Sequence, residues 1–405
     1  MTNRHPKKTT RLRELIGIFL KLGILGFGGP VAHIAMMEQE VVHRRNWITK
    51  EYFLDLVGAT NLIPGPNSTE MAIHIGYIRA GWSGLVIAGM CFILPATLIT
   101  AVFGWAYVKF GSLPKVAPFL SGIKPTVLAV MLFGLWRLGK TAVKSWQLSV
   151  IGMCVLIVSL LKVDEVAALL GGGLIGMIWL RLSPQGKTSH SKKTIIELAC
   201  ISIGAMLSET RISAETGAMM AVGVEGLVAF SLSKLGFFFL KVGAVLFGGG
   251  FVLVAFLEGG LVHDYGWLSQ QQLLDAIAIG QFTPGPILST ATFIGYLLSG
   301  IPGALVATIA IFFPSFFFVA ALNPVVPRLR QSSWTSAFLD AVNVSSVALM
   351  LAVTVKLSQT ALVSWSNWAI AVAAVGAIFL WKLNGFWLIL GGATLGWLLS
   401  ALGLT

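Results

Sequence analysis

Long apolar segments, separated by short polar or basic stretches, follow one another along the whole chain. Apolar segments of about 20 residues are typical of helices that cross a lipid bilayer. The segments lie near residues 14–42, 53–78, 82–108, 118–138, 146–162 and 164–181, and then near 194–231, 236–261, 273–297, 301–322, 338–358, 361–381 and 386–404. We therefore expect an all-α polytopic membrane protein.

The composition and the charge pattern agree with a membrane protein. Of the 405 residues, 56% are hydrophobic and only 11% are charged, whereas a soluble domain has about 25% charged residues. The net charge of +12 comes from basic clusters between the apolar segments, beginning with Arg4 to Arg13. Such clusters mark cytoplasmic loops under the positive-inside rule. We expect a cytoplasmic N-terminus and no nucleic acid partner.

No motif in the sequence indicates an enzyme. Cys91, Cys154 and Cys200 lie far apart in apolar segments, which fits neither a metal site nor a disulfide framework. The chain also has no Walker-type phosphate loop and no H-E-x-x-H zinc motif. We expect no catalytic residues, no cofactor and no metal.

The chain contains an internal duplication. When the sequence is shifted by 220 positions, residues 19–66 align without a gap with residues 239–286. A Phe-Gly-Gly motif and a Pro-Gly-Pro motif recur in register within this alignment. The sequence predicts an N-terminal repeat over 1–180, a basic cytoplasmic linker over 181–193, and a C-terminal repeat over 194–405.

Corresponding loops of the two repeats differ in charge. Arg44 and Arg45 in the first repeat correspond to Asp264 and Tyr265 in the second. The positive-inside rule places the first loop in the cytoplasm and the second on the other side. We expect inverted repeats, which are common in secondary transporters; the alternative is that both halves face the same way.

Glycine and proline interrupt the apolar segments of both repeats. The segment 14–42 is basic at both ends, so it should enter the membrane and turn back at Gly28–Pro30, and Pro64–Pro66 breaks the next segment. New helices should begin directly after these breaks and after their counterparts in the second repeat. A helix start carries unpaired N–H groups and a partial positive charge. Several such starts that meet in mid-membrane would form an anion site.

The residues at the breaks are the candidate substrate ligands. Their Ser, Thr and Asn side chains can donate hydrogen bonds to an anion, or they can serve only as helix caps. One lysine in each repeat lies within an apolar segment, where charge is costly and usually functional; structural pairs with Asp55 and Asp275 are the alternative. The candidates are Lys21, Gly28, Gly29, Pro30, Pro64, Gly65, Pro66, Asn67, Ser68, Thr69, Lys241, Gly248, Gly249, Pro284, Gly285, Pro286 and Ser289.

Three other residues are candidates for proton coupling. Glu70 and His74 are four positions apart, on one face of the helix that should follow Pro66. A buried Glu–His pair can exchange a proton near neutral pH, or it can be a polar pair that only lines a cavity. His33 follows the glycine turn closely enough to face the same cavity.

The paired motifs resemble those of a known family. Phe27-Gly28-Gly29-Pro30 and Pro64-Gly65-Pro66-Asn67, with their second copies, are similar to the signature of the chromate transporter (CHR) family in its long, two-domain form. The resemblance covers both halves and implies chromate export across the bacterial inner membrane, which confers chromate resistance. Gly250 replaces Pro30 and Ile287 replaces Asn67 in the second copy, which puts an equal contribution of the two halves in question.

The leading functional hypothesis is secondary active export of chromate, coupled to a proton or a counter-anion. Chromate is a tetrahedral dianion, and helix starts with hydroxyl and lysine donors suit such a group. Sulfate has the same shape and charge, so an importer or exchanger of sulfate or another oxyanion is one alternative. A passive anion channel is the other. The expected partners are the substrate, the coupling ion and the lipid membrane, and a homodimer is left open.

Overall fold

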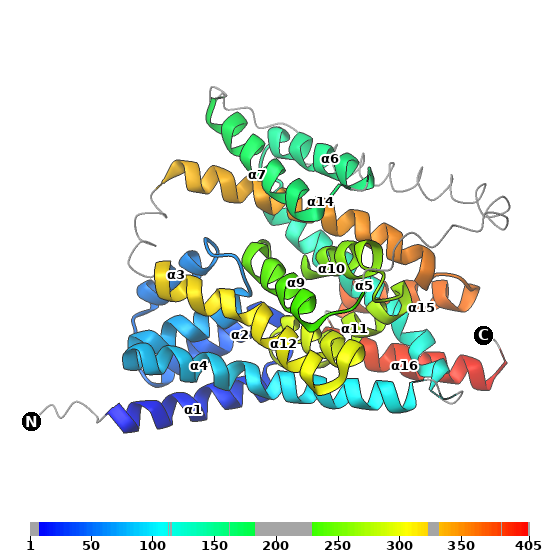
Figure 1. Ribbon diagram of the computed structural model, residues 1–405, viewed down its shortest axis with the longest axis horizontal. Helices are drawn as coiled ribbons and strands as arrows, with labels where there is room; N and C mark the ends of the chain where they lie inside the picture. The colour runs from blue at the N-terminus through cyan, green and yellow to red at the C-terminus, as the bar shows by residue number, and fades with distance from the viewer. Residues whose placement is uncertain are drawn as a thin grey trace, which may run out of the picture.

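The computed structural model describes residues 8–111, 113, 116–161, 163–182, 229–322, 332–381 and 383–403. Helices account for nearly all of these residues, and no strand occurs among them (Figure 1). The all-α prediction is therefore confirmed. The linker predicted over 181–193 and the apolar segment predicted over 194–231 lie almost entirely outside the described residues.

The two repeats contain corresponding helices in the same order. The first repeat has α1 (Lys8–Leu25), α2 (Gly29–Glu38), the π-helix η1 (Gln39–Arg44), α3 (Lys50–Thr60), α4 (Asn67–Phe110), α5 (Ala117–Ala142), α6 (Trp146–Leu160) and α7 (Glu165–Leu182). The second repeat has α9 (Leu232–Val245), α10 (Leu253–Leu257), the π-helix η3 (Glu258–Asp264), α11 (Gln270–Phe282), the 3-10 helix η4 (Ile287–Ser289), α12 (Thr290–Leu322), α14 (Ser333–Ala361), α15 (Trp365–Trp381) and α16 (Gly385–Ala401). The duplication in the sequence is thus a duplication of structure.

The apolar surface is that of a protein that crosses the membrane several times. Among the described residues, five helices are long and apolar enough to span a bilayer, namely α4, α5, α7, α14 and the helix Ile287–Ala321. On α12, large apolar side chains four residues apart are all exposed: Ile301, Leu305, Ile309, Phe313 and Phe317. Residues at this spacing share one helix face. Such a face suits contact with lipid.

Both Pro-Gly-Pro motifs interrupt the helices, as the sequence predicts. α3 ends at Thr60 and α4 begins at Asn67, directly after Pro66. The second Pro-Gly-Pro likewise separates α11 from η4. After the glycine breaks the repeats differ, because α2 contains Pro30 in its first turn whereas α10 begins only at Leu253. Proline pre-sets the helical φ angle, and glycine at position 250 does not.

The first apolar segment folds into the predicted hairpin. His33 Nε2 in α2 donates a hydrogen bond of 2.8 Å to the carbonyl oxygen of Gly26. Further along, Lys21 Nζ in α1 lies 3.4 Å from Glu40 Oε1 in η1. α2 and η1 therefore run back along α1, as a segment with both ends on one side of the membrane requires.

α4 and α12 are also hairpins, because the chain reverses within each of them. In α4 the reversal is at Ala80–Gly81, which have non-helical backbone angles. Gly76 and Gly84 then face each other so closely that a Cβ atom on Gly76 would lie 2.3 Å from the Gly84 oxygen. In α12 the two arms are joined by a hydrogen bond of 2.7 Å between Thr292 and Thr308.

The two repeats are inverted relative to each other. α5 and α14 are corresponding helices and pack side by side. Lys144, just beyond the end of α5, pairs at 2.6 Å with Asp340 near the start of α14. One turn earlier in α5, Gly139 packs against Val347, further along α14. Corresponding helices therefore run antiparallel, which confirms the predicted inverted repeats.

The last helices of each repeat pack on the other repeat. α6 and α7 lie against α14, whereas α15 and α16 lie against α5 (Figure 1). The largest hydrophobic core joins α5 and α14 to the second-repeat segments α10 and α11, for example through Met131, Met350, Phe256 and Ile277. The first hairpin and α3 form a separate core with α4 instead. The two ends of the molecule are therefore packed differently.

Candidate functional site

The breaks of the two repeats are bonded to each other. The N–H of Gly65 donates to the carbonyl oxygen of Leu246 at 2.8 Å, and the N–H of Gly285 donates to that of Gly26, also at 2.8 Å. Gly65 corresponds to Gly285, and Gly26 corresponds to Leu246. The Pro-Gly-Pro motif of each repeat is thus hydrogen-bonded to the backbone at the glycine break of the other repeat.

Gly65 shows why this position is a glycine. Its φ angle is +142°, where residues with a Cβ are strained. A Cβ atom would also lie 2.3 Å from Glu70 Oε1 and 2.7 Å from Ser315 Oγ. The break therefore brings the backbone against a buried carboxyl group and a hydroxyl group from the other repeat.

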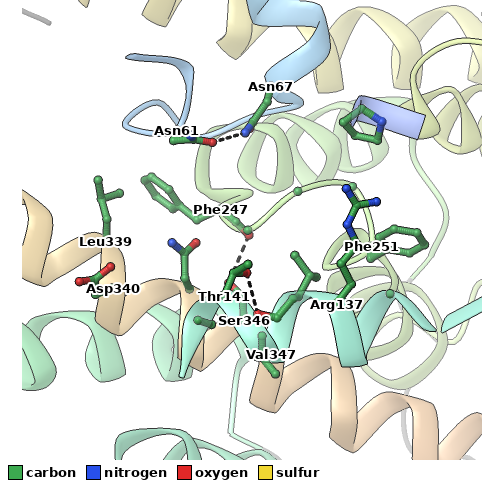
Figure 2. Close-up of a pocket in the computed structure, with 18 of the residues that line it drawn as sticks. Asn61, Asn67, Arg137, Thr141, Phe247, Phe251, Leu339, Asp340, Ser346 and Val347 are labelled. Atoms are coloured by element: carbon green, nitrogen blue, oxygen red, sulfur yellow. Dashed lines mark hydrogen bonds between the residues drawn. The ribbon is translucent and has the colours of Figure 1, made fainter. Parts of the chain in front are cut away.

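A cavity of about 590 Å³ lies between the repeats, which we call the first cavity (Figure 2). Its walls come from the start of α2, the loop before α4, the second half of α5, the break after α9 and the first half of α14. The lining residues are Pro30, Val31, Asn61, Leu62, Ile63, Asn67, Gly134, Arg137, Leu138, Thr141, Ala142, Lys144, Phe247, Gly248, Gly249, Gly250, Phe251, Ser336, Leu339, Asp340, Asn343, Ser346 and Val347.

One of the cations that line the first cavity has no carboxylate partner among the described residues. Lys144 is neutralised by Asp340, to which it is paired at 2.6 Å. Arg137 is exposed to the cavity and has no carboxylate partner among the described residues. In Figure 2 its side chain extends from α5 toward the loop that carries Phe251. The cavity therefore carries a net positive charge at Arg137.

Amide and hydroxyl groups supply the other polar atoms of the first cavity. Asn67 Nδ2 donates to Asn61 Oδ1 at 2.5 Å, and Ser346 Oγ donates to the carbonyl oxygen of Phe247 at 3.2 Å (Figure 2). Asn343 lies in the same wall as Ser346. The second N–H of Asn67 Nδ2 and the amide of Asn343 can donate hydrogen bonds to oxygen atoms in this cavity.

A second cavity, of about 400 Å³, adjoins the first. Both are lined by Arg137 together with Pro30, Gly134 and Phe251. The second cavity also contains Gly26, Gly28, Gly29, Gln281, Thr283, Gly285 and Ile287. Ile287 stands where the first cavity has Asn67, so the second cavity is the less polar of the two.

The chemical groups in this region can bind an oxyanion. A guanidinium group presents planar, forked donors that match two oxygen atoms of one anion. The start of α2 adds a partial positive charge and the backbone N–H groups of Gly29 and Val31, since Pro30 has none. No group of three or more potential metal ligands occurs among the described residues.

The structure brings some predicted ligands to the cavities and leaves others in the surrounding core. Pro30, Asn67, Gly248 and Gly249 line the first cavity, and Gly28, Gly29, Pro30 and Gly285 line the second. The remaining break residues are buried and line neither cavity: Pro64, Gly65, Pro66, Ser68, Thr69, Pro284, Pro286 and Ser289. The asparagine, serine and threonine residues after the first Pro-Gly-Pro do not cap α4, because its N-cap is Pro66.

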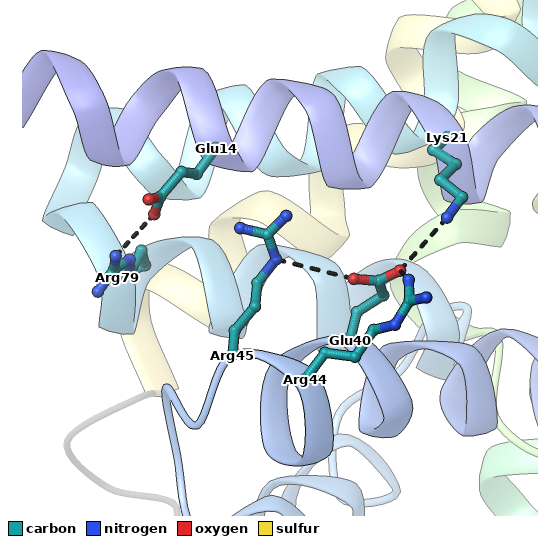
Figure 3. A network of polar contacts seen from close by, with 6 residues as sticks. All are labelled: Glu14, Lys21, Glu40, Arg44, Arg45 and Arg79. Carbon is teal, nitrogen blue, oxygen red and sulfur yellow. Dashed lines mark hydrogen bonds and ion pairs between the residues drawn. The ribbon is translucent and has the colours of Figure 1, made fainter.

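The two predicted lysines lie at the surface. Lys21 pairs with Glu40, which also contacts Arg44 and Arg45 (Figure 3). Lys241 pairs at 2.9 Å with Asp164. Both lysine side chains are 52% exposed, and neither lines either of the two cavities. The geometry gives them no contact with an anion at Arg137.

The ion pair of Lys241 differs from the sequence-based alternative of a Lys–Asp pair within each repeat. Burial by itself would raise the pKa of Asp164, but the hydrogen bond from Lys241 and backbone hydrogen bonds outweigh burial and lower it. Asp275 instead accepts a hydrogen bond of 2.8 Å from the Tyr107 hydroxyl. Lys241 therefore links the loop before α7 to α9.

Glu70 and His74 form a buried polar cluster beside the first Pro-Gly-Pro. Glu70 is 0% exposed and His74 is 1% exposed. Neither carboxylate oxygen of Glu70 and neither ring nitrogen of His74 has a hydrogen-bond partner among the described residues. Ser315 Oγ, which lies near Glu70 across Gly65, is also unpartnered there. His33 differs, because its Nε2 is bonded to the hairpin turn at Gly26.

Sequence reasoning missed Arg137, the residue at the centre of the two cavities. Arg137 lies near the end of the apolar segment 118–138, close to Lys140 and Lys144. Basic residues in that position normally mark the membrane boundary. The available signal was its counterpart in the second repeat, Lys356, which is also basic.

Comparison with known proteins gives one family. The model of the family described as "Chromate transporter" matches residues 13–177 and again 233–397. No solved structure matches the chain.

Curated relatives match over nearly the whole chain. A chromate transport protein of Cupriavidus metallidurans is 32% identical over 393 residues, covering 96% of this chain and 94% of the relative. A chromate transport protein of Pseudomonas aeruginosa is 30% identical, covering 95% and 92%. A probable chromate transport protein of Synechococcus elongatus is 29% identical, covering 94% and 92%. With both repeats matched by the family model, the chain belongs to the chromate transporter family.

Proposed function

We propose that this protein is a secondary active transporter that exports chromate across the bacterial inner membrane and thereby confers chromate resistance. The observation that carries the proposal is Arg137, a cation without a carboxylate partner among the described residues, in a cavity lined by the breaks of both inverted repeats. An exposed cation that lines a cavity between the repeats, with no carboxylate paired to it, is available to bind an anion.

The substrate class follows from the chemistry of the cavity and from the relatives. Arg137 offers forked donors, and asparagine amides and the start of α2 line the same cavity. A tetrahedral dianion of oxygen atoms uses such donors on several sides at once. The names of the relatives favour chromate among the anions of this shape.

Inverted repeats support an alternating-access transporter over a passive channel. In such transporters one repeat moves against the other around a central site. The two ends of this molecule are packed differently, although their sequences correspond. A channel requires no such difference between its ends.

We assign proton coupling to Glu70, with His74 beside it and His33 at the neighbouring turn. A carboxyl group buried without a partner is costly when ionised, so it tends to bind a proton. Glu70 follows the Pro-Gly-Pro motif that holds the break of the other repeat. A proton on Glu70 would thus act at the junction of the two repeats.

The topology is part of the proposal. The basic residues around Arg44 and in the linker 181–193 favour a cytoplasmic N-terminus and a cytoplasmic linker between the repeats 1–180 and 194–405. The exposed apolar faces of α4 and α12 suit lipid, and a second copy of the chain could cover one of them.

Inside-out membrane vesicles test the proposal. Their cytoplasmic face is outward, so an exporter should accumulate chromate inside them, with saturation and with stimulation by an acidic interior. Sulfate added in excess should compete weakly. Strong competition by sulfate would change the assigned substrate, and uptake without saturation or counterflow would indicate a channel.

Glu70→Gln tests the coupling. We expect the variant to lose accumulation driven by the pH gradient but to keep chromate counterflow, because exchange moves no net proton. Glu14→Gln is the matched control, since Glu14 is a partly exposed carboxylate paired with Arg79 at 2.6 Å. Gradient-driven accumulation by folded Glu70→Gln protein would contradict the assignment.

A further inference from the structure

The two repeats contain a corresponding cation near the end of a corresponding helix. Arg137 lies five residues before Ala142, the last residue of α5, and Lys356 lies five residues before Ala361, the last residue of α14. The sequences after the two cations also match, with Thr141 corresponding to Thr360. The surroundings of Arg137 and Lys356 can therefore be compared directly.

In the second repeat the cation, Lys356, forms an ion pair with a carboxylate. Lys356 Nζ lies 2.5 Å from Glu258 Oε1 at the start of η3. The Glu258 side chain is 4% exposed, although Lys356 itself is 41% exposed. One turn further along α14, the hydroxyl of Thr360 donates to the side-chain oxygen of Gln270 at the start of α11. Two polar contacts thus fasten η3 and α11 to the end of α14.

In the first repeat the corresponding groups are apart. The counterpart of Glu258 is Glu38, which lies 3.7 Å from His43 and 3.9 Å from Lys50. Lys50 is the counterpart of Gln270, so the two groups that would cover α5 pair with each other instead. Arg137 and Thr141 are left to line the first cavity.

The packing of the helices shows the same difference. α10 and α11 pack on α14, and their apolar side chains belong to the core that contains Met350 and Val353. No comparable packing of α2 or α3 on α5 is found among the described residues. Glu258 and Gln270 therefore belong to an end of the molecule where the segments of the second repeat pack on α14, which we call the closed end. Their counterparts Glu38 and Lys50 belong to the other end, where α2 and α3 do not pack in this way on α5, which we call the open end.

We propose that Lys356 is a second, covered binding residue for the transported oxyanion, and that the pairs Glu258–Lys356 and Glu38–Arg137 form in turn. The proposal rests on the transport function proposed above. In the state described here Arg137 is available to the anion and the Glu258 carboxylate occupies Lys356. In the opposite state Glu38 covers Arg137, and the anion lies at Lys356.

With the anion bound, this exchange pairs each of the two cations with one anionic group in both states. Exchange of a carboxylate for an oxyanion keeps the charge compensated. If the two inverted repeats interchange their conformations, the same movement breaks one of the two ion pairs and forms the other. The anion then moves from the end with Arg44 and Arg45 to the end with Asp264, the direction of export.

The relative populations of the two states can be measured by the accessibility of introduced thiols, in the absence of any transported anion. Val347 on α14 lines the first cavity and is partly exposed, whereas its counterpart on α5, Leu128, is buried. Val347→Cys and Leu128→Cys are introduced singly into a chain whose three native cysteines are replaced by serine. Glu258→Gln should slow labelling of the Val347→Cys thiol and speed labelling of the Leu128→Cys thiol, each by about three- to tenfold, since it weakens the closed end.

A second substitution makes this test decisive. Glu38→Gln, added to Glu258→Gln, removes the competing pair, so both labelling rates should return toward the parent values. A Glu258 that merely stabilises the fold would not be rescued from the other repeat. Failure of the rescue, or unchanged rates in Glu258→Gln, would overturn the exchange while leaving chromate transport in vesicles untouched.

The anion site at Lys356 has its own test. Lys356→Gln is compared with the parent in the Glu38→Gln/Glu258→Gln background, in which the two states should be populated as in the parent and no buried lone carboxylate is left. Chromate binding to the solubilised protein, which Arg137 provides, should change less than twofold, whereas vesicle transport should fall at least tenfold. Unchanged transport, or binding that falls in parallel with transport, would refute the assignment. Normal thiol exchange without chromate transport would instead refute only the proposed function.

Discussion

At the residue scale, the surroundings of a cation decide what it can bind. Lys21 and Arg137 both occur within apolar segments of the sequence. Lys21 is half exposed and already paired with Glu40 in a surface network (Figure 3). Such pairs contribute only about 0–1 kcal/mol and are screened by salt. Arg137 is also exposed, but it lines a cavity between the repeats and has no carboxylate partner among the described residues.

Arg137→Ala should lower chromate transport in vesicles by about 10- to 100-fold, because charge-assisted hydrogen bonds contribute roughly 1.5–3 kcal/mol. Arg137→Lys should restore part of the loss, since it keeps the charge but not the fork. Lys140→Ala is the matched control on the same helix, because the Lys140 side chain lines neither cavity. Normal transport by folded Arg137→Ala protein would contradict the site.

At the element scale, small residues set how closely the helices approach. The backbone of Gly392 in α16 lies against α5, where an added Cβ would be 2.0 Å from Thr126 Oγ1 and 2.7 Å from the Gly122 oxygen. The same holds between α7 and α14, where a Cβ on Gly173 would be 2.4 Å from Val342. Close approach of backbones is how helices gain packing energy in a membrane, which has no hydrophobic effect between helices.

Gly392→Ala should therefore destabilise the protein by about 1–3 kcal/mol through overpacking. Its neighbour Gly391 provides the control, since a Cβ there meets nothing within 4 Å. Gly391→Ala should leave stability unchanged or raise it by up to about 1 kcal/mol, as alanine favours helix. Both effects can be read from the temperature at which half of the detergent-solubilised protein remains monodisperse. Equal behaviour of the two variants would refute the proposed helix contact.

At the scale of the whole molecule, neither repeat completes its own packing. α6 and α7 cover α14 of the other repeat, and α15 and α16 cover α5. Each repeat alone would leave these apolar faces without their partners. The central cavities likewise need both repeats, because Arg137 comes from the first and Gly248–Gly250 from the second.

Two separate chains, residues 1–182 and 183–405, should therefore assemble when they are expressed together and should transport chromate in vesicles. Either chain alone should aggregate or be degraded. The measurement is recovery of the untagged chain with the tagged one after solubilisation. A single repeat that is monodisperse and leaves the other chain behind would show that the repeats do not depend on each other.

The sequence was sufficient for the features that follow from local chemistry. Proline and glycine interrupt helices wherever they occur together, so the breaks at Pro64–Pro66 and Pro284–Pro286 could be placed from the sequence. Charge at loop ends reports membrane sidedness, so Arg44 and Asp264 predicted the inversion that α5 and α14 display.

Only the tertiary structure decided which side chains meet. Arg137 and Lys356 are equivalent in sequence, as are Glu38 and Glu258. Yet Glu258 is paired with Lys356, whereas Glu38 contacts Lys50 and not Arg137. The difference arises because α10 and α11 pack on α14 while α2 and α3 pack elsewhere. Local sequence determines where a helix begins and ends and which side its loops occupy, but contacts between distant helices depend on how all of them pack together.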